Sequence, residues 1–368
     1  MKKALIIAYN DLNNSGVPNI IYQTIKALHN EYLFDVLVFG DDTYYFERLK
    51  NDGIKINLIR FNEIKPKSKI FKLFWWLFKM PRNHYLFAKK LMLKSGYDVV
   101  HSFKELYSWP FFKAAKKVGI KKRIFHNNVD LKRNSKTKYE LLDVRNLRLS
   151  IKYSTLRVGV SKLCCENAFK KHNSFVLYNC YDETKFNNDN VVQLPDNELV
   201  ITQVGTFNEN KNQLFSLEIL KVIKEKYINA KLYLVGADDV SHYHQKLIDL
   251  VNNNDLIKNV VFIQKCKNIE KYYKNSTFAI IPSYSEGFSL VAIEAQACGL
   301  TVFASTSIPN EVNVGGVKFL DLNKGPEHWA NVILETFEKQ KNRRKIYDLS
   351  VFSFNRFKKE LTKIYEIE

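Results

Sequence analysis

Short, mostly apolar runs of four to six residues recur along the chain, each bounded by polar or turn-forming residues. Such runs are typical of strands that are buried on both faces of a parallel sheet. The predicted strands are residues 4–8, 34–39, 98–102, 123–126, 200–204, 231–235, 260–263, 278–281 and 301–304, and the predicted helices include 20–28, 111–118 and 214–226. Because strands alternate with helices, the pattern predicts doubly wound parallel sheets.

The series of strands and helices occurs twice, which predicts two domains. A polar, proline-containing segment, residues 187–196, lies between the two series, so we place the boundary there. Residues 1–186 form the first predicted domain and residues 187–349 the second. A length of 368 residues is sufficient for two hydrophobic cores of ordinary size. The predicted fold class is therefore α/β, with two doubly wound parallel sheets.

The charge balance narrows the range of partners. The chain has 57 Lys and Arg against 38 Asp and Glu, a formal net charge of +19. This excess predicts an anionic partner, which would be a nucleic acid, an anionic lipid or a phosphorylated substrate. Five cysteines without a C-x-x-C pair indicate reduced thiols in a cytosolic protein. We expect neither a signal peptide nor a membrane-spanning segment. No metal ion or other cofactor is expected, because no His, Cys and Asp residues have ligand spacing.

Two glutamates eight positions apart, Glu286 and Glu294, follow the predicted strand 278–281. Residues 290–298 are mostly apolar and lack Gly and Pro, which predicts a helix. Open α/β sheets bind ligands beyond the carboxyl ends of their strands, so the turn between strand and helix is a candidate site. The amides of Gly287, Phe288 and Ser289 would form an anion site at the helix N-terminus. We expect Glu286 in the turn and Glu294 about two turns along the helix, where a buried carboxylate would need a partner.

The segment 283–299, with Glu286-Gly287-Phe288 and Glu294-Ala-Gln-Ala-Cys-Gly, resembles the E-x7-E signature of retaining, nucleotide-sugar-dependent glycosyltransferases. It is most similar to glycosyltransferase family 4, as in bacterial polysaccharide and capsule biosynthesis. The resemblance continues in family order through residues 14–17, 97–102, 123–128 and 178–186. It implies the GT-B fold, in which two Rossmann-like domains face a cleft. Residues 1–186, with a crossing helix at 350–368, would bind the acceptor, and residues 187–349 the nucleotide sugar.

The same resemblance implies roles for individual residues. Glu286 would contact the hydroxyls of the donor sugar, Glu294 the ribose, and Lys211 the leaving diphosphate. His126 would lie near the anomeric centre, where it could orient the donor or relay the acceptor proton, while His101 is interpreted as a core residue. The expected catalytic residues are His126, Glu286 and Lys211, and the expected donor-binding residues are Gly16, Gly205, Thr206, Lys211, Glu286, Gly287, Phe288, Ser289 and Glu294.

The family pattern is not matched everywhere. Thr206 stands where the family has an arginine, Phe103 replaces a histidine, and Cys180 replaces a glycine. Thr206 can donate a hydrogen bond but carries no charge for the leaving diphosphate. These departures favour one alternative, a degenerate chain that serves as a binding or chaperone subunit of a partner transferase. This alternative is disfavoured by the presence of the family residues Glu286, Lys211 and Glu294.

Residues 65–94 form a second unusual segment, with nine Lys and Arg, no acid and interleaved aromatic residues. Basic residues beside Trp and Phe are typical of helices in a membrane interface. We predict contact with an anionic membrane through Lys67, Lys69, Lys72, Trp75 and Trp76. A core helix with a basic solvated face is the other interpretation. Nucleic-acid binding is disfavoured, because no recognition motif accompanies the segment.

Together these features predict a retaining, metal-independent glycosyltransferase. It would move a hexose or N-acetylhexosamine from a nucleoside-diphospho sugar, a UDP-sugar above all, to a lipid-linked or saccharide acceptor. The enzyme would be cytoplasmic and peripheral on the inner face of the cell membrane, and would serve surface polysaccharide or glycolipid biosynthesis. A nucleotide-sugar epimerase of the same fold remains an alternative. A glycosidase is disfavoured, because its two carboxyls flank one bond at about 5–10 Å, whereas Glu294 is expected inside a helix.

Overall fold

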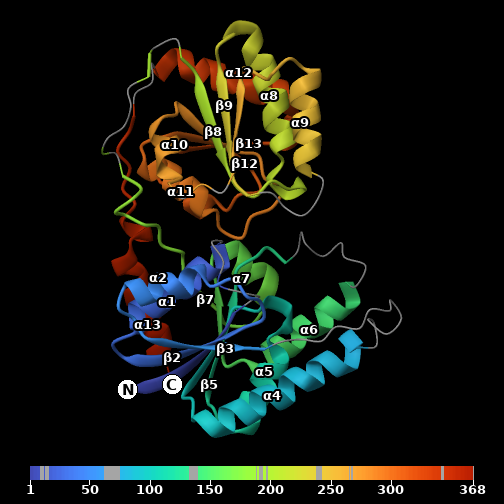
Figure 1. The fold of residues 1–368 in the computed structure, drawn as a ribbon, viewed down its shortest axis with the longest axis vertical. Helices are drawn as coiled ribbons and strands as arrows, with labels where there is room; N and C mark the ends of the chain where they lie inside the picture. The colour runs from blue at the N-terminus through green and yellow to red at the C-terminus, as the bar shows by residue number, and fades with distance from the viewer. Residues whose placement is uncertain are drawn as a thin grey trace. The chain divides into compact units, whose positions relative to one another are not determined.

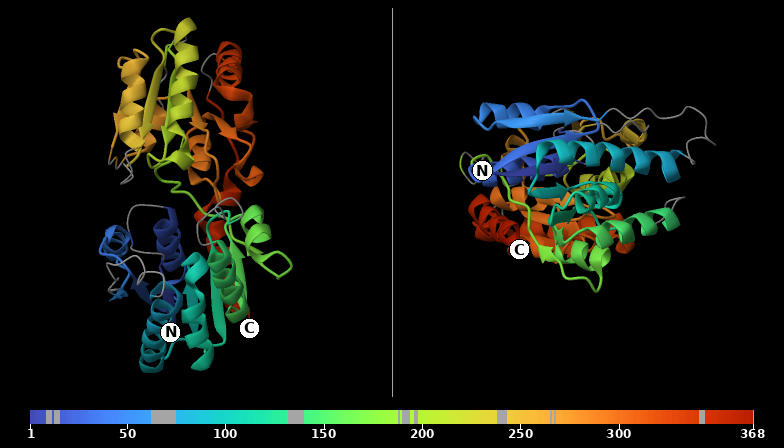
Figure 2. Two further views of the ribbon diagram at one scale, coloured as in Figure 1. Left: turned by 90° about the vertical axis from the view of Figure 1, so that its right-hand side faces the viewer. Right: turned by 90° about the horizontal axis from the view of Figure 1, so that it is seen from below.

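The computed structural model describes residues 1–8, 12, 16–61, 75–131, 140–187, 189, 194–195, 198–237, 243–264, 266, 268–340 and 344–367. The chain forms two compact units, coloured along the sequence in Figure 1. The first unit consists of Met1–Cys180 together with Phe354–Glu368, and the second of Tyr181–Ser353. Each unit contains one sheet with helices on both faces (Figure 2).

The first unit is built on a parallel sheet with the strand order β3-β2-β1-β4-β5-β6-β7. Its strands are β1 (Lys2–Ile7), β2 (Tyr32–Val38), β3 (Ile56–Arg60), β4 (Val99–Ser102), β5 (Lys122–Asn127), β6 (Leu156–Gly159) and β7 (Phe175–Val176). Its helices are α1 (Gly16–Leu28), α2 (Tyr44–Asn51), α4 (Met80–Ser95), α5 (Trp109–Lys117), α6 (Glu140–Tyr153), α7 (Lys162–Phe169) and α13 (Phe354–Glu366), with short turns Trp75–Lys79 and Glu105–Tyr107. Parallel strands require crossover connections, which the helices supply.

The core of the first unit lies between its sheet and its helices. Leu5, Ile7, Val100 and Phe125 contribute to this core together with residues of α4 and α5. The helix α13 follows the whole second unit in the chain, yet it packs against α1 in the first unit. Its buried residues Phe357, Leu361, Ile364 and Tyr365 recur at helical spacing, so they form one apolar face. The first unit is therefore completed by a segment from the other end of the sequence.

The second unit has a parallel sheet with the strand order β10-β9-β8-β11-β12-β13. Its strands are β8 (Val200–Val204), β9 (Lys231–Val235), β10 (Val260–Ile263), β11 (Phe278–Ile281), β12 (Thr301–Ser305) and β13 (Val317–Leu320). Its helices are α8 (Gln213–Lys226), α9 (Tyr243–Asn253), α10 (Glu270–Lys274), α11 (Leu290–Ala297) and α12 (Gly325–Gln340), with short turns Glu209–Lys211, Asn310–Val312, Leu322–Lys324 and Ser350–Phe352. The strand order reverses between β8 and β11, and such a switch point is the usual ligand site of an open sheet.

The predicted fold class, two parallel α/β sheets, is confirmed. The strands that the sequence did not reveal are β3, β6, β7 and β13, all of which lie at or next to a sheet edge. Strands near an edge contain polar or exposed residues, so they lack the continuous apolar run of a central strand. All five cysteines are free thiols, as expected.

The structure corrects part of the predicted membrane segment. Lys67, Lys69 and Lys72 lie outside the described residues. The side chain of Trp75 is only 7% exposed, so its predicted contact with a membrane is wrong: the ring belongs to the interior. Trp76 packs edge-on against Tyr107, with ring centroids 4.9 Å apart. Among the described residues, none of the helices has the length and apolar character needed to cross a bilayer.

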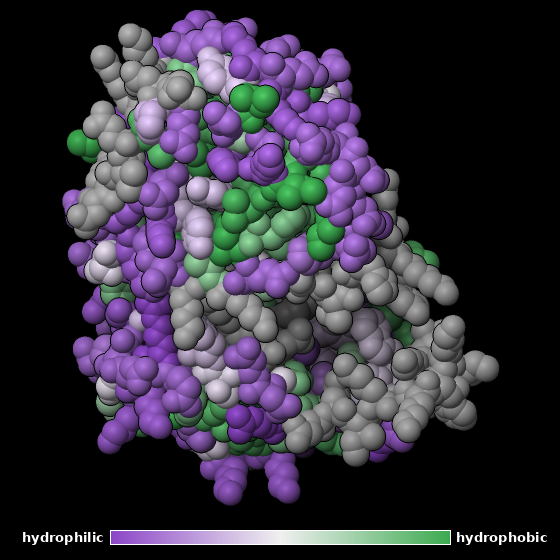
Figure 3. All heavy atoms as spheres, turned by 45° about the horizontal axis from the view of Figure 1, so that its top comes forward, coloured by the Kyte–Doolittle hydropathy of each residue, from purple (hydrophilic) through white to green (hydrophobic). Residues whose placement is uncertain are grey.

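The surface in Figure 3 is mainly hydrophilic, and hydrophobic side chains gather in one area of that face. A predominance of polar residues agrees with a chain in which 26% of the residues are charged.

Candidate functional site

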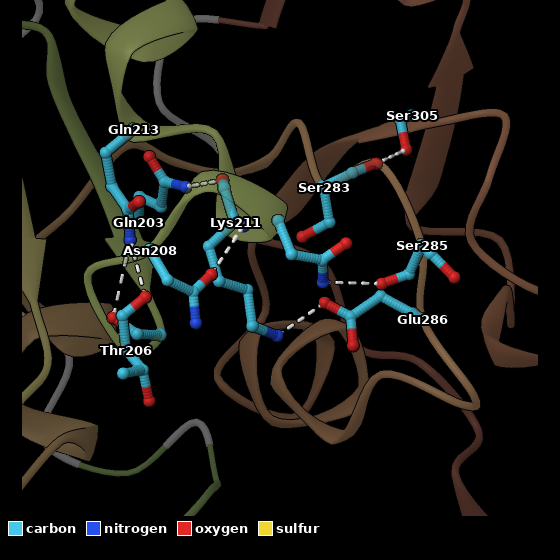
Figure 4. A network of polar contacts seen from close by, with 11 residues as sticks. Gln203, Thr206, Asn208, Lys211, Gln213, Ser283, Ser285, Glu286 and Ser305 are labelled. Carbon is cyan, nitrogen blue, oxygen red and sulfur yellow. Dashed lines mark hydrogen bonds and ion pairs between the residues drawn. The ribbon is translucent and has the colours of Figure 1, made fainter. Parts of the chain in front are cut away.

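Two loops of the second unit meet at the switch point of its sheet. Residues 205–212 follow β8, and residues 282–289 follow β11. The amide of Tyr284 donates to the Asn210 carbonyl at 2.9 Å, and Asn210 Nδ2 donates to the Ser285 carbonyl at 2.8 Å. Asn212 Nδ2 also donates to the Pro282 carbonyl at 3.2 Å. These bonds fix the two loops to each other, so that side chains from both can share one site (Figure 4).

Lys211 and Glu286 form an ion pair across the two loops. Lys211 Nζ lies 2.5 Å from Glu286 Oε1, and their side chains are 21% and 13% exposed. Figure 4 shows the two side chains pointing toward each other. A charge-assisted hydrogen bond of this kind is stronger than a neutral one, and enclosure protects it from the screening that weakens surface pairs. The structure therefore brings together two of the residues predicted to be catalytic.

The backbone around Lys211 is held by polar side chains. The Asn208 side chain accepts a hydrogen bond from the Lys211 amide at 3.0 Å, which caps the short helical turn Glu209–Lys211. Gln203 Nε2 donates to the Lys211 carbonyl at 2.6 Å. A methyl group at Gly205 would lie 3.2 Å from Lys211 Cδ, so the glycine leaves room for the lysine chain. The direction of the Lys211 side chain is thus set by its loop.

The two loops end in left-handed residues that are not glycine. Asn212 has φ 56° and precedes α8, while Ser289 has φ 85° and precedes α11. A left-handed conformation costs an ordinary L-residue such as Ser about 1–2 kcal/mol, whereas Asn adopts it more readily. Strain of this kind is concentrated at functional sites, where the surrounding structure enforces it. Both positions lie at the same edge of the sheet as the Lys211–Glu286 pair.

Several buried polar atoms at this edge have no partner within the described residues. They are Gln203 Oε1, Gln213 Oε1, Ser283 Oγ and Ser289 Oγ. Gln213 is held by a bond from its Nε2 to the Thr206 carbonyl at 3.0 Å, and Ser305 Oγ donates to the Ser283 carbonyl at 2.6 Å. Buried polar atoms normally find partners, so this group is suited to binding a polar ligand.

Gln203, Gln213 and Ser283 were not among the predicted site residues. The available signal was the polar pair Thr202 and Gln203 in an otherwise apolar strand.

Glu294 lies on α11, which begins at Leu290, so it is about one turn into the helix rather than the predicted two. Its carboxylate has no hydrogen bond or ion pair among the described residues. Its pKa is raised to about 7, mainly by desolvation; the charges of Asp182 and Glu270 act in the same direction, and Lys185 opposes them. Glu294 is therefore a largely desolvated carboxyl group in α11. Within the described part of the chain, no group of three or more His, Cys, Asp or Glu side chains could hold a metal ion.

The predicted residues between the two glutamates have different roles in the fold. Phe288 is buried and packs edge-on against Phe352, with ring centroids 5.6 Å apart. Its side chain therefore anchors the loop. Gly287 and Ser289 lie on either side of it, immediately before α11. Thr206 is exposed on the opposite loop.

Gly16 and His126 belong to the first unit, whereas the other predicted site residues of the two loops and α11 belong to the second. Gly16 is exposed at the start of α1. His126 lies near the carboxyl end of β5 and is fully buried, as is the predicted core residue His101. Burial lowers the pKa of His126 to about 3 and that of His101 well below its ordinary value, so both imidazoles are neutral near pH 7.

Comparison with known proteins relates much of the second unit to a family model. Residues 184–348 match the family model described as "Glycosyl transferases group 1". The chain is 27% identical over 371 residues to the capsular polysaccharide biosynthesis glycosyltransferase CapH of Staphylococcus aureus, covering 97% of each chain. It is 30% identical over 137 residues to the putative glycosyltransferase EpsF of Bacillus subtilis, which covers 37% of this chain and 35% of EpsF.

Solved structures share the fold of the whole chain. The structure of Anabaena HepE in complex with UDP has a TM-score of 0.77 and 14% identity, with 99% of each chain covered. The complex of the same protein with UDP-glucose has a TM-score of 0.75. TarM has a TM-score of 0.74 and 10% identity, covering 100% of this chain and 99% of its own. At sequence identities of 14% and 10%, the structural similarity establishes the fold alone.

The close packing of Gly205 and Gly236 generates a test of how the site is held. A Cβ atom at Gly236 would lie 2.0 Å from the Gly205 carbonyl oxygen, so Gly236→Ala must displace the loop that carries Lys211. We expect a loss of about 2–3 kcal/mol in the free energy of unfolding of the second unit, measured by urea denaturation. Thr206→Ala, an exposed change on the same loop, should cost less than about 0.5 kcal/mol. Equal stability of the two variants would contradict this account.

Proposed function

Because the chain belongs to the group 1 glycosyl transferases and has their two-sheet GT-B architecture, we propose that it is a retaining, metal-independent glycosyltransferase with a UDP-sugar donor. The observation that carries the proposal is the enclosed Lys211–Glu286 pair at the switch point of the second sheet. The sugar is a hexose or N-acetylhexosamine, and the acceptor is a saccharide or a lipid-linked saccharide. The likeness to CapH supports a place in capsular or related surface polysaccharide synthesis.

The ion pair supplies both groups that a nucleotide-sugar donor needs. Before the donor binds, each charge has the other as its partner, so neither is left unpaired in a partly desolvated site. When the donor enters, Glu286 accepts hydrogen bonds from sugar hydroxyls and Lys211 turns to the diphosphate. Negative charge grows on the diphosphate as the glycosidic bond breaks, and a cation already in place stabilises that transition state.

The remaining residues of the second unit fit other parts of the donor. Lys211 is the single cation of the 205–212 loop, and the exposed Thr206 adds a hydroxyl but no charge. The backbone of Gly205 on one loop and of Gly287 and Ser289 before α11 can approach the diphosphate, where a helix N-terminus favours an anion. Glu294 then holds the ribose, because two vicinal hydroxyls can donate to one carboxylate.

Lys211→Ala tests the central assignment. Loss of a transition-state stabiliser costs about 3 kcal/mol, so kcat for sugar transfer should fall by a factor of about 100 or more. Lys221→Ala, which removes an exposed lysine from α8, is the control and should leave kcat unchanged. UDP at 100 times its Kd should stabilise the wild-type protein by about 2.7 kcal/mol in a thermal-shift assay. A kcat for Lys211→Ala within twofold of wild type would remove the lysine from the mechanism, and a product of inverted configuration would exclude retention.

The raised pKa of Glu294 predicts how donor binding depends on pH. The ionised carboxylate accepts the ribose hydroxyls, and its ionised fraction falls as the pH drops through about 7. The affinity for UDP, measured by calorimetry, should therefore fall about tenfold between pH 8 and pH 6. The Glu294→Gln variant should bind UDP more weakly at pH 8, and its affinity for UDP should change less between pH 8 and pH 6. Any pH dependence that remains in the variant comes from titration of the diphosphate. The same slope in both proteins would remove the ribose role.

The helix α4 and the turn before it support peripheral binding to the inner face of the membrane. The exposed residues Lys79, Arg82, Leu86 and Lys90 recur at spacings of three and four, which places them along one face, and the apolar Phe78 and Leu93 are 60% and 65% exposed. Apolar side chains among basic ones are suited to an anionic lipid surface. In the proposed membrane contact, these exposed residues take the place of Trp75, because the Trp75 ring is buried.

Charge reversal on this surface tests the proposed membrane contact. The triple change Lys79→Glu, Arg82→Glu and Lys90→Glu should abolish co-sedimentation with vesicles that contain anionic lipid, and high salt should weaken wild-type binding because exposed charges are screened. The control is Lys221→Glu with Lys258→Glu and Lys271→Glu, which changes the net charge equally on the second unit. Equal loss in both triple variants would show that net charge alone drives binding.

A further inference from the structure

A chain of buried polar groups crosses the first unit from its last helix to the end of β5. Tyr365 Oη lies 2.9 Å from His101 Nδ1, and His101 Nε2 lies 3.2 Å from His126 Nδ1. All three side chains are buried. The planes of the two imidazoles differ by only 5°, which is compatible with a hydrogen bond between their ring nitrogens. This series of hydrogen bonds ends at His126 Nε2, which has no partner within the described part of the protein.

The surrounding residues prevent these rings from turning freely. Phe103 lies over His101, with ring centroids 4.3 Å apart, and contacts His126 at 4.8 Å. Tyr365 packs edge-on against Tyr32 at 5.1 Å, and Lys122 Nζ donates to the main-chain carbonyl of Tyr365. Close packing of this kind fixes side-chain positions. The order of the three hydrogen-bonding groups is therefore a stable feature of the first unit.

The hydrogen bonds that link Tyr365, His101 and His126 can run in either of two directions. A neutral imidazole has one donor and one acceptor nitrogen, and burial keeps both rings neutral by lowering the pKa of each. If Tyr365 donates to His101 Nδ1, then His101 Nε2 donates to His126 Nδ1, and His126 carries its own hydrogen on Nε2. In the opposite direction the Tyr365 hydroxyl hydrogen has no acceptor among the described residues. His126 Nε2 has no partner among the described residues in either direction, but only the second direction also leaves the buried Tyr365 hydroxyl without an acceptor, so the first direction is preferred.

We propose that Tyr365 and His101 are positioning residues that hold His126 as a neutral Nε2–H hydrogen-bond donor toward a substrate oxygen at the carboxyl edge of the first sheet. This inference rests on the proposed function. His126 lies near the carboxyl end of its strand, the edge at which open α/β sheets bind ligands. Its free Nε2–H orients or polarises an oxygen. A nitrogen that already carries its hydrogen cannot take up the acceptor proton, so His126 is not the base of the reaction.

The tautomer of His126 can be measured directly in the full-length protein labelled with ¹⁵N-histidine. The chain has eight histidines, and loss of one signal set in His126→Gln assigns His126. Two-bond couplings between ring protons and nitrogens should show hydrogen on Nε2 in the wild type. Tyr365→Phe removes only the hydroxyl that sets the direction, so it should shift His126 toward the Nδ1–H tautomer. The same variant should lower kcat about tenfold and leave the Kd for UDP within twofold.

Tyr32→Phe is the matched control, because it removes the hydroxyl of a neighbouring buried tyrosine that makes no bond to His101. It should change neither the tautomer nor kcat. An Nδ1–H tautomer in the wild type, or an unchanged tautomer in Tyr365→Phe, would overturn the proposal. The wild-type measurement decides the direction even where a variant fails to fold. If the expected tautomers were found but the wild type transferred no sugar, the proposed function would fail while the hydrogen-bond chain stood.

Discussion

The site of the second unit depends on an ion pair that neither of its loops can form alone. Lys211 comes from the loop after β8 and Glu286 from the loop after β11. The connections that leave β8 and β11 run to opposite sides of the switch point, and both begin at the same edge of the sheet. A lysine or glutamate enclosed there without a partner would be strongly unfavourable. The pair therefore joins the two halves of the sheet at its switch point.

The structure around the pair contains several features that are unfavourable by themselves. Asn212 and Ser289 hold left-handed backbone conformations, and Gly236 lets the neighbouring loop lie directly against the end of β9. Polar atoms of Gln203, Gln213 and Ser289 remain buried without partners among the described residues. The surrounding contacts maintain the strained backbone. Buried polar atoms without partners are uncommon in folded proteins. Several of these features lie close to the Lys211–Glu286 pair at one edge of the sheet.

The sequence predicted the central strands well, because β8, β9 and β11 are buried and read as short apolar runs. Strands such as β3 and β13 were missed, since edge positions relax that pattern. The E-x7-E pattern pointed to Glu286 and Glu294, but no spacing rule reveals that Glu286 pairs with Lys211, which is 75 positions away. Likewise, adjacent tryptophans look alike in sequence, and only packing shows that Trp75 is interior while Trp76 lies against Tyr107.

The return of α13 to the first unit has a consequence for protein synthesis. Residues 181–353 are translated before α13, so the nascent first unit waits for its last helix while the whole second unit emerges from the ribosome. During that interval the apolar face formed by Phe357, Leu361 and Ile364 is not yet available to cover α1. Domains usually fold in the order in which they are made. Here the unit made first is finished last, and a truncated polypeptide would expose apolar surface to chaperones and proteases.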